Sequence, residues 1–139
     1  MRSLYSKIAL LFLIVQALSG CVDKSDSYDT IDDARNNHVF EKGWLPDLLP
    51  NSTYDLKLVT AVDVSAGRGK FSFDPKEYRD FSAKLSEYDG GMSKIDNDNK
   101  SIRMLLNEGY EARAYSSGAT NWLFLCEQRE AVCEFFVWQ

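Results

Sequence analysis

The chain has 139 residues, of which 16 are lysine or arginine and 21 are aspartate or glutamate, so its formal net charge is −5. This length suits one domain and is too short for two. The acidity argues against nucleic acid as a partner, because proteins bind the phosphates of nucleic acids through clustered lysine and arginine side chains.

The first twenty residues have the pattern of a secretory signal peptide. Arg2 and Lys7 form a charged start, and an apolar run follows from Ile8 to Val15. This run is too short to cross a hydrocarbon core, which requires roughly 20 apolar residues. A short apolar run behind a basic start is typical of a signal peptide rather than of a membrane helix. Removal of residues 1–20 takes away two cations and no acid, so the expected mature charge is −7.

The residues around the predicted cleavage site resemble the lipobox of bacterial lipoproteins, with the sequence Leu18-Ser19-Gly20-Cys21. The resemblance implies that the thiol of Cys21 receives a diacylglyceryl group and that cleavage occurs just before it. Two or three acyl chains give a stable membrane anchor, since each buried methylene contributes about 0.8 kcal/mol. The alternative is an ordinary secretory cleavage with a cysteine nearby by chance.

The residue after the cysteine bears on which membrane holds the anchor. In Gram-negative lipoproteins an aspartate at this position favours retention on the inner membrane, and here the residue is Val22. The resemblance therefore implies the outer membrane, and we expect the protein on its periplasmic face. Asp23, one position later, leaves the inner membrane as the alternative.

The mature chain is predicted to begin with a tether. Residues 21–29 are expected to comprise the lipidated cysteine and a flexible tether, because they are polar and lack apolar periodicity. The globular domain is then expected to span 30–139. Thr30 and Asp33 form a plausible capping pair for a helix that ends near Gly43.

A segment rich in proline and apolar residues follows this helix. Pro46 and Pro50 forbid a long helix and favour an extended or turn-rich path. Gly43-Trp44-Leu45-Pro46, Leu49-Pro50 and Phe71-Ser72-Phe73 resemble the pattern of a group of small, uncharacterised Gram-negative lipoproteins. In that group a short helix leads into a Gly-Trp-Leu-Pro stretch, a second proline, a strand, a turn and a Phe-x-Phe strand. The resemblance covers roughly the first half of the mature chain and implies an envelope lipoprotein without an assigned activity.

The middle of the chain is predicted to form a hairpin and a helix. The β-branched run from Thr53 to Val64 favours a strand, Ser65 to Gly69 a turn, and Lys70 to Phe73 the partner strand. Asp74 followed by Pro75 is a typical helix start. The apolar face of this helix is predicted to comprise Tyr78, Phe81, Leu85 and Tyr88, and Gly90 and Gly91 to end it.

The last third is predicted to be an antiparallel meander. Its expected strands are Ser101 to Leu106, Tyr110 to Tyr115, Asn121 to Glu127, and Val132 to Trp138. With Arg129 and Glu130 in the final turn, Cys126 lies opposite Cys133, at the separation that a disulfide requires. The same register places Phe124 opposite Phe135 and Trp122 opposite Val137. In an oxidising compartment we expect a Cys126–Cys133 disulfide, with two free buried thiols as the alternative.

The residues that carry chemistry give little sign of catalysis. His38 is the single histidine and has no visible catalytic partner, and Asp96 to Asn99 lacks the glycine and glutamate of a calcium loop. We therefore expect no metal, no cofactor and no catalytic residue. Trp44 and Trp138 are the candidate partner contacts, with burial in the core as the alternative for both.

These observations predict one small α+β domain, with a mostly antiparallel sheet and one or two packed helices. The function expected is a non-enzymatic accessory lipoprotein that binds an envelope protein, for example an immunity lipoprotein that neutralises a toxin. The acidic composition suggests a cationic surface on the partner. The alternative is an envelope enzyme that acts on a cell-wall or lipid substrate through paired carboxylates.

Overall fold

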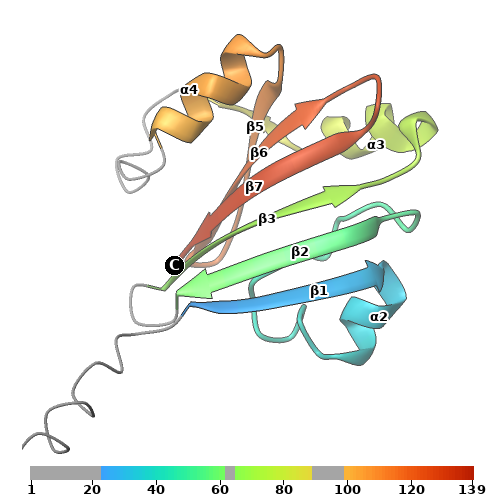
Figure 1. The fold of residues 1–139 in the computed structure, drawn as a ribbon, viewed down its shortest axis with the longest axis vertical. Coiled ribbons are helices and arrows are strands. Elements are labelled where there is room, and N and C mark those ends of the chain that lie inside the picture. Colours follow the sequence, from blue (N-terminus) through green and yellow to red (C-terminus); the bar gives the residue numbers. More distant parts are fainter. Residues whose placement is uncertain (1–22, 62–64, 89–98) are drawn as a thin grey trace, which may run out of the picture.

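One twisted antiparallel sheet organises the molecule, in a computed structural model that describes residues 23–61, 65–88 and 99–139 (Figure 1). Its seven strands lie in the order β1-β2-β3-β7-β6-β5-β4. Their bounds are Lys24–Thr30 (β1), Tyr54–Ala61 (β2), Ala66–Ser72 (β3), Ser86–Glu87 (β4), Glu111–Ser117 (β5), Thr120–Glu127 (β6) and Val132–Trp138 (β7). The helices are short: α2 (Ile31–Asn36), the 3₁₀ turn η3 (Pro75–Glu77), α3 (Tyr78–Ala83) and α4 (Asn99–Asn107). The chain is thus a single small domain made mostly of sheet.

The predicted tether is wrong from Lys24 onward, because this segment forms the edge strand β1. It pairs with β2 from Lys24 opposite Thr60 to Thr30 opposite Tyr54. Tyr28 packs against the core, while most of its neighbours in β1 are exposed. An antiparallel edge strand with a solvated face tolerates this polarity, since backbone pairing supplies much of its stability. The folded domain therefore starts about six residues earlier than the sequence predicted.

Strand β2 confirms the predicted strand over Tyr54–Ala61, but the turn predicted for Ser65 to Gly69 is wrong. The glycines there lie inside β3 instead. A Cβ at Gly69 would collide with the backbone carbonyl oxygen of Lys57 and lie 2.5 Å from Cζ of Phe135. Glycine is therefore required at this position for close packing of neighbouring strands and not for a turn.

Helix α2 confirms the predicted capping pair. The backbone N–H of Asp33 donates to Thr30 Oγ1, and that of Thr30 donates to the Asp33 carboxylate. The helix ends at Asn36, earlier than predicted, and turns lead through the segment before β2.

The second helix begins where the sequence predicted. The Asp74 side chain accepts from the backbone N–H of Lys76, and Pro75 follows it in η3. However, α3 ends at Ala83, and the short strand β4 follows where the sequence predicted further helix.

The strand predicted for Ser101 to Leu106 is wrong, because this segment forms α4. Ile102 and Leu105 are buried, whereas Met104 and Leu106 are exposed, and a spacing of three suits a helix. Strand β5 consequently pairs with β4 and β6 rather than forming a hairpin with residues 101–106.

The final hairpin has the predicted register. Cys126 lies opposite Cys133, Phe124 opposite Phe135, and Trp122 opposite Val137. The two cysteines form a disulfide with an S–S distance of 2.01 Å. Each of these six side chains is buried, at 3% exposure or less.

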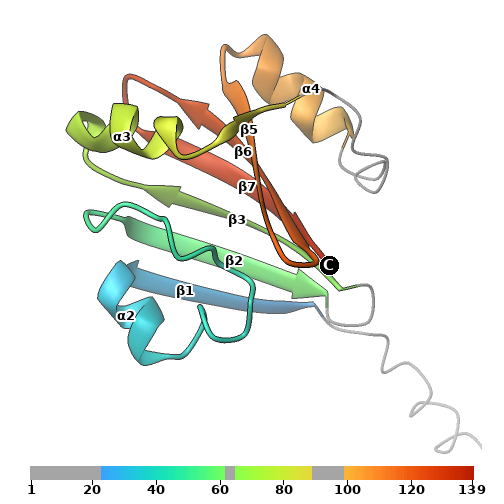
Figure 2. The ribbon, with the colours of Figure 1, turned by 180° about the vertical axis from the view of Figure 1, so that it is seen from behind.

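The sheet carries an apolar cluster on each face. The larger cluster joins Phe71, Phe124 and Phe135 to α2, α3 and the segment after α2, which Figure 2 shows in front of the sheet. The smaller cluster packs Ile102 and Leu105 of α4 onto the opposite face of β6 and β7. Among the described residues, α4 is the only helix on this second face, and it covers just the half of the sheet formed by β5, β6 and β7.

Candidate functional site

The sequence-predicted site residues do not come together in one place. Cys21 lies outside the described residues, so the structure gives no position for the predicted acylation site. Cys126 and Cys133 form the predicted disulfide inside the larger apolar cluster. Their role in the fold is to join β6 to β7 within the core.

Trp44 and Trp138 lie on opposite faces of the sheet. Trp44 is half-buried against the larger cluster, and its backbone carbonyl accepts from Nε1 of Trp122 at 3.0 Å. Trp138 is half-buried against the smaller cluster, on the side of α4. The two tryptophans therefore cannot form a single contact patch.

The remaining polar candidates are His38 and the acidic loop from Asp96 to Asn99. His38 is exposed, and its Nδ1 lies 2.9 Å from a carboxylate oxygen of Glu41. Residues 96–98 of the acidic loop lie outside the described residues. Within the described ranges, no group of three or more histidine, cysteine, aspartate or glutamate side chains could hold a metal ion.

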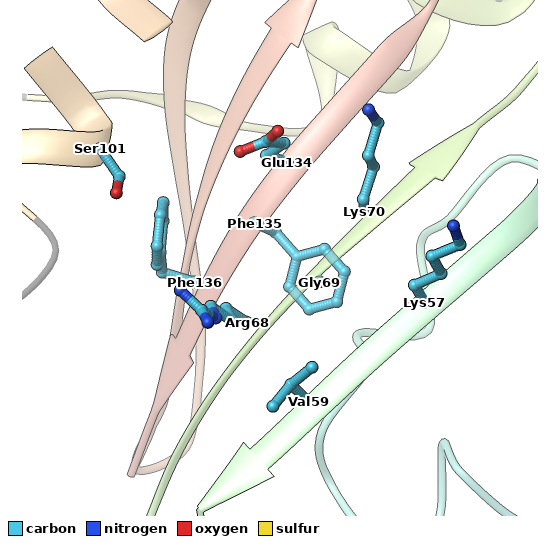
Figure 3. A pocket seen from close by; sticks show the side chains of 9 residues that line it. All are labelled: Lys57, Val59, Arg68, Gly69, Lys70, Ser101, Glu134, Phe135 and Phe136. Atoms are coloured by element: carbon cyan, nitrogen blue, oxygen red, sulfur yellow. The ribbon is translucent and has the colours of Figure 1, made fainter. Parts of the chain in front are cut away.

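A groove of about 250 Å³ opens on the second face of the sheet (Figure 3). It lies beside α4, where strands β2 and β3, which α4 does not cover, meet β7. We call it the basic groove. Its lining comprises Lys57, Val59, Arg68, Gly69, Lys70, Ser101, Glu134, Phe135 and Phe136. Three of the nine residues are cations and one is an acid, in a chain whose net charge is negative.

Strand register explains why these side chains share the groove. Lys57 of β2 lies directly opposite Lys70 of β3, and Lys70 lies opposite Glu134 of β7. Directly opposed residues point to the same face of an antiparallel sheet. The sheet thus places the two lysines and the glutamate in one row.

The adjacent row supplies an apolar floor. Arg68 of β3 lies opposite Val59 on one side and Phe136 on the other. Phe136 is buried at 5% exposure, and Figure 3 shows the Arg68 side chain beside it. The groove therefore combines three cations with two apolar side chains, the half-buried Val59 and the buried Phe136.

A second, more open hollow lies beside α3, where Tyr78, Glu111 and Arg113 meet. The Tyr78 hydroxyl donates to the Glu111 carboxylate at 3.0 Å, and Arg113 also donates to this carboxylate at 2.9 Å through Nε. Burial and the carboxylate acceptor raise the pKa of Tyr78 to about 12. The Arg113 hydrogen bonds lower the pKa of Glu111, burial opposes them in part, and the hydrogen bond from Tyr78 lowers the pKa further.

These pKa shifts keep Tyr78 neutral and Glu111 negatively charged at neutral pH. A general acid requires a carboxyl pKa raised toward neutrality, and that of Glu111 moves the other way. The trio therefore acts as a hydrogen-bonded link between α3 and β5.

Sequence reasoning missed the basic groove, although part of its signal is visible. Arg68 and Lys70 alternate with glycine, and Lys57 and Val59 also lie two apart, which is the spacing of side chains on one face of a strand. The strand order could not be predicted from the sequence, because no local pattern indicates that β3 lies between β2 and β7.

The comparisons with known proteins concern the first three strands. The family model of the YbbD head domain matches residues 23–72, a little over a third of the chain, and the match ends at the last residue of β3. No curated protein and no solved structure matches the chain. The chain is thus similar to the YbbD head domain over β1, α2, β2 and β3. This segment includes Lys57, Arg68 and Lys70 of the basic groove, whereas Glu134 and Phe136 lie beyond it.

None of the helices in the described part of the chain is long and apolar enough to cross a membrane.

Proposed function

We propose that the chain is the precursor of a bacterial lipoprotein, anchored through acyl chains on Cys21 to the periplasmic face of the outer membrane. The lipobox-like sequence before Cys21 and the signal-like residues 1–20 support this proposal. The resemblance of the chain to small Gram-negative lipoproteins with a Gly-Trp-Leu-Pro segment also supports the proposal. We assign the fold to the α+β class, with the short helices packed on both faces of the sheet.

The proposed activity is non-enzymatic binding of an envelope partner. The observation that carries this proposal is the basic groove at the edge of an uncovered half of the sheet. Charged side chains at the rim of an apolar floor can orient a partner and speed its association. An immunity lipoprotein that neutralises an incoming toxin is one form that such a binding protein takes.

The start of β1 fits an anchored arrangement. Lys24 is three residues after Cys21, so the chain between them spans at most about 11 Å. Ser25 and Ser27 of β1 lie opposite Val59 and Lys57, on the face of the groove. The anchor would therefore hold the start of β1 close to the membrane surface.

The alternative of a carboxylate enzyme has weaker support. Glu111 is the described carboxylate whose pKa is shifted by its neighbours, and the shift is downward. Its neighbours Arg113 and Tyr78 stabilise the charged form, which suits a structural link and not proton donation.

The proposed lipid anchor is tested by replacing Cys21, the residue that accepts the acyl chains. We expect the wild-type protein to fractionate with membranes and to carry the mass of its acyl groups on the peptide that begins at Cys21. The Cys21→Ala variant should lose both the lipid mass and the membrane association. A Cys21→Ala protein that is cleaved normally and stays on the membrane would contradict the proposed anchor.

The binding activity is tested by reversible crosslinking in cells, followed by detergent extraction and mass spectrometry. We expect a stoichiometric partner that is lost when Lys57, Arg68 and Lys70 are all replaced by glutamate. The matched control replaces Lys76, Arg79 and Lys84, exposed cations of the α3 region, by glutamate. Equal loss of the partner in both variants would argue against the groove as the binding site.

A further inference from the structure

The basic groove holds two cations that the fold places against each other. Lys57 and Lys70 are directly opposed on neighbouring strands, where Cβ atoms are about 4.5–5.5 Å apart. Like charges in this position are destabilising. None of the four ion pairs in the described part of the chain includes a residue of the groove. A bound anion between the two amino groups would turn this repulsion into attraction.

The third cation extends the anion site toward the apolar floor. Arg68 lies in the next row, two residues along β3 from Lys70 and directly between Val59 and Phe136. A guanidinium group donates two parallel hydrogen bonds to a carboxylate or phosphate. A phosphate monoester offers three terminal oxygens to such donors, whereas a carboxylate offers only two. The floor beside Arg68 suits an apolar group attached to that anion.

Helix α4 adds to the positive potential of the groove. Ser101, in the first turn of this nine-residue helix, lines the wall of the groove. The N-terminal end of a helix carries a partial positive charge that favours anions. Glu134 opposes Lys70 and offsets part of the charge, which leaves the groove with two net positive charges.

The size of the groove limits the ligand. About 250 Å³ is below the roughly 300–1,000 Å³ of sites that enclose a drug-sized molecule. The groove can hold one phosphate and a short apolar group, or the end of a larger ligand.

We infer that the basic groove binds a phosphate ester whose apolar portion packs on Val59 and Phe136. Lys57, Lys70 and Arg68 hold the phosphate, and Ser101 closes the side toward α4. This inference names the ligand of the face proposed above and so rests on the proposed binding function.

Calorimetric titration of the purified acylated protein in neutral detergent tests the inference. Phenyl phosphate is the probe, with inorganic phosphate and phenol as its two separate halves and benzoate as the carboxylate counterpart. We expect phenyl phosphate to bind at least about tenfold more tightly than each of these three. Its affinity should fall as salt is added, because the cations are exposed.

Two variants identify the binding residues. Lys57→Ala/Lys70→Ala should weaken phenyl phosphate binding at least about tenfold, since it removes two charge-assisted donors. Lys76→Ala/Lys84→Ala makes the same change of charge near α3, on the opposite face, and should leave the affinity unchanged. Unchanged thermal unfolding of both variants shows that the fold is retained. Equal weakening in the two variants, or tight binding of phenol alone, would overturn the inference.

A further probe distinguishes the source of the phosphate. A membrane headgroup is a phosphodiester with one negative charge, so glycerophosphoglycerol represents it in soluble form. Comparable binding of this diester supports a lipid headgroup, and at least about tenfold preference for the monoester supports a free phosphate ester. If neither probe binds while the in-cell partner is still lost on charge reversal of the groove, the ligand class is wrong and the binding function stands.

Discussion

At the scale of single residues, Thr53 carries an unsatisfied polar group in the core. It is 2% exposed, and its Oγ1 has no hydrogen-bond partner in the described part of the chain. A buried hydroxyl without a partner costs free energy that an apolar group of the same shape does not. Such a residue is a local weakness that the fold tolerates.

Thr53→Val replaces the hydroxyl with a methyl group of similar size. We expect it to raise the free energy of unfolding by about 1 kcal/mol, measured by urea denaturation. Thr53→Ser is the matched control, because it keeps the hydroxyl and removes the methyl, and it should destabilise the protein. A Thr53→Val variant that is less stable than wild type would show that the hydroxyl has a partner.

Gly69 is the second informative residue, because β3 packs too closely for a side chain there. Gly69→Ala should lower the free energy of unfolding by about 3 kcal/mol, since the new Cβ would strike the carbonyl of Lys57 and the ring of Phe135. Gly118→Ala is the control: Gly118 has open space around it but a φ of +60°, and the left-handed backbone should cost an alanine about 1 kcal/mol. Equal losses in the two variants, measured by denaturant unfolding, would contradict the packing argument.

Among the secondary-structure elements, the hydrogen-bonded link between α3 and β5 makes the stability of the fold depend on pH. Hydrogen bonds from Arg113 and Tyr78 lower the pKa of Glu111 below its ordinary value of 4.5. A carboxylate whose pKa is lower in the folded state stabilises that state above the unfolded pKa. This stability is lost as the pH falls through the folded pKa.

Glu111→Gln should therefore reduce stability near neutral pH, and the difference from wild type should shrink below about pH 4.5. Thermal unfolding at a series of pH values measures this difference. Glu130→Gln, which removes an exposed carboxylate from the β6–β7 turn, is the matched control for the loss of one negative charge. A constant difference between Glu111→Gln and wild type across the acidic range would refute the role of the Glu111 charge.

The β6–β7 hairpin contains a short covalent loop. The disulfide joins residues seven apart in sequence, and loop-closure entropy predicts that it contributes about 2 kcal/mol to stability. The variant Cys126→Ala/Cys133→Ala should lose at least this amount, because both sulfurs are also buried. The check is urea unfolding of the variant beside wild type, and no loss of stability would contradict the prediction.

The elements also show what the sequence could and could not predict. The β6–β7 register was predictable because two cysteines and a short turn fix it locally. Helix α4 was not, because a short apolar run fits a strand or a buried helix equally well until its neighbours are known. Strand β1 was missed because its polar residues carry no periodic signal and are held by pairing with β2.

At the scale of the whole molecule, the distribution of charge matters more than its sum. Net acidity predicted a cationic partner, whereas the strand order gathers Lys57, Arg68 and Lys70 at one groove. The groove needs β2, β3 and β7 side by side, and its lining residues range from Lys57 to Phe136 in the sequence. Only the tertiary pairing brings them together, so composition and motifs could not predict this site.

We propose that the uncovered half of the sheet is the binding face of an anchored lipoprotein. The most direct measurement is photo-crosslinking in cells from single positions of the full-length chain. Ser27 lies on the face of the groove, and Asp32 lies in α2, which packs on the other face. We predict a crosslinked product from a photoreactive residue at Ser27 and none from one at Asp32. The product should disappear when Lys57, Arg68 and Lys70 are reversed in charge. A product from Asp32 alone, or one from Ser27 that survives charge reversal, would contradict the claim.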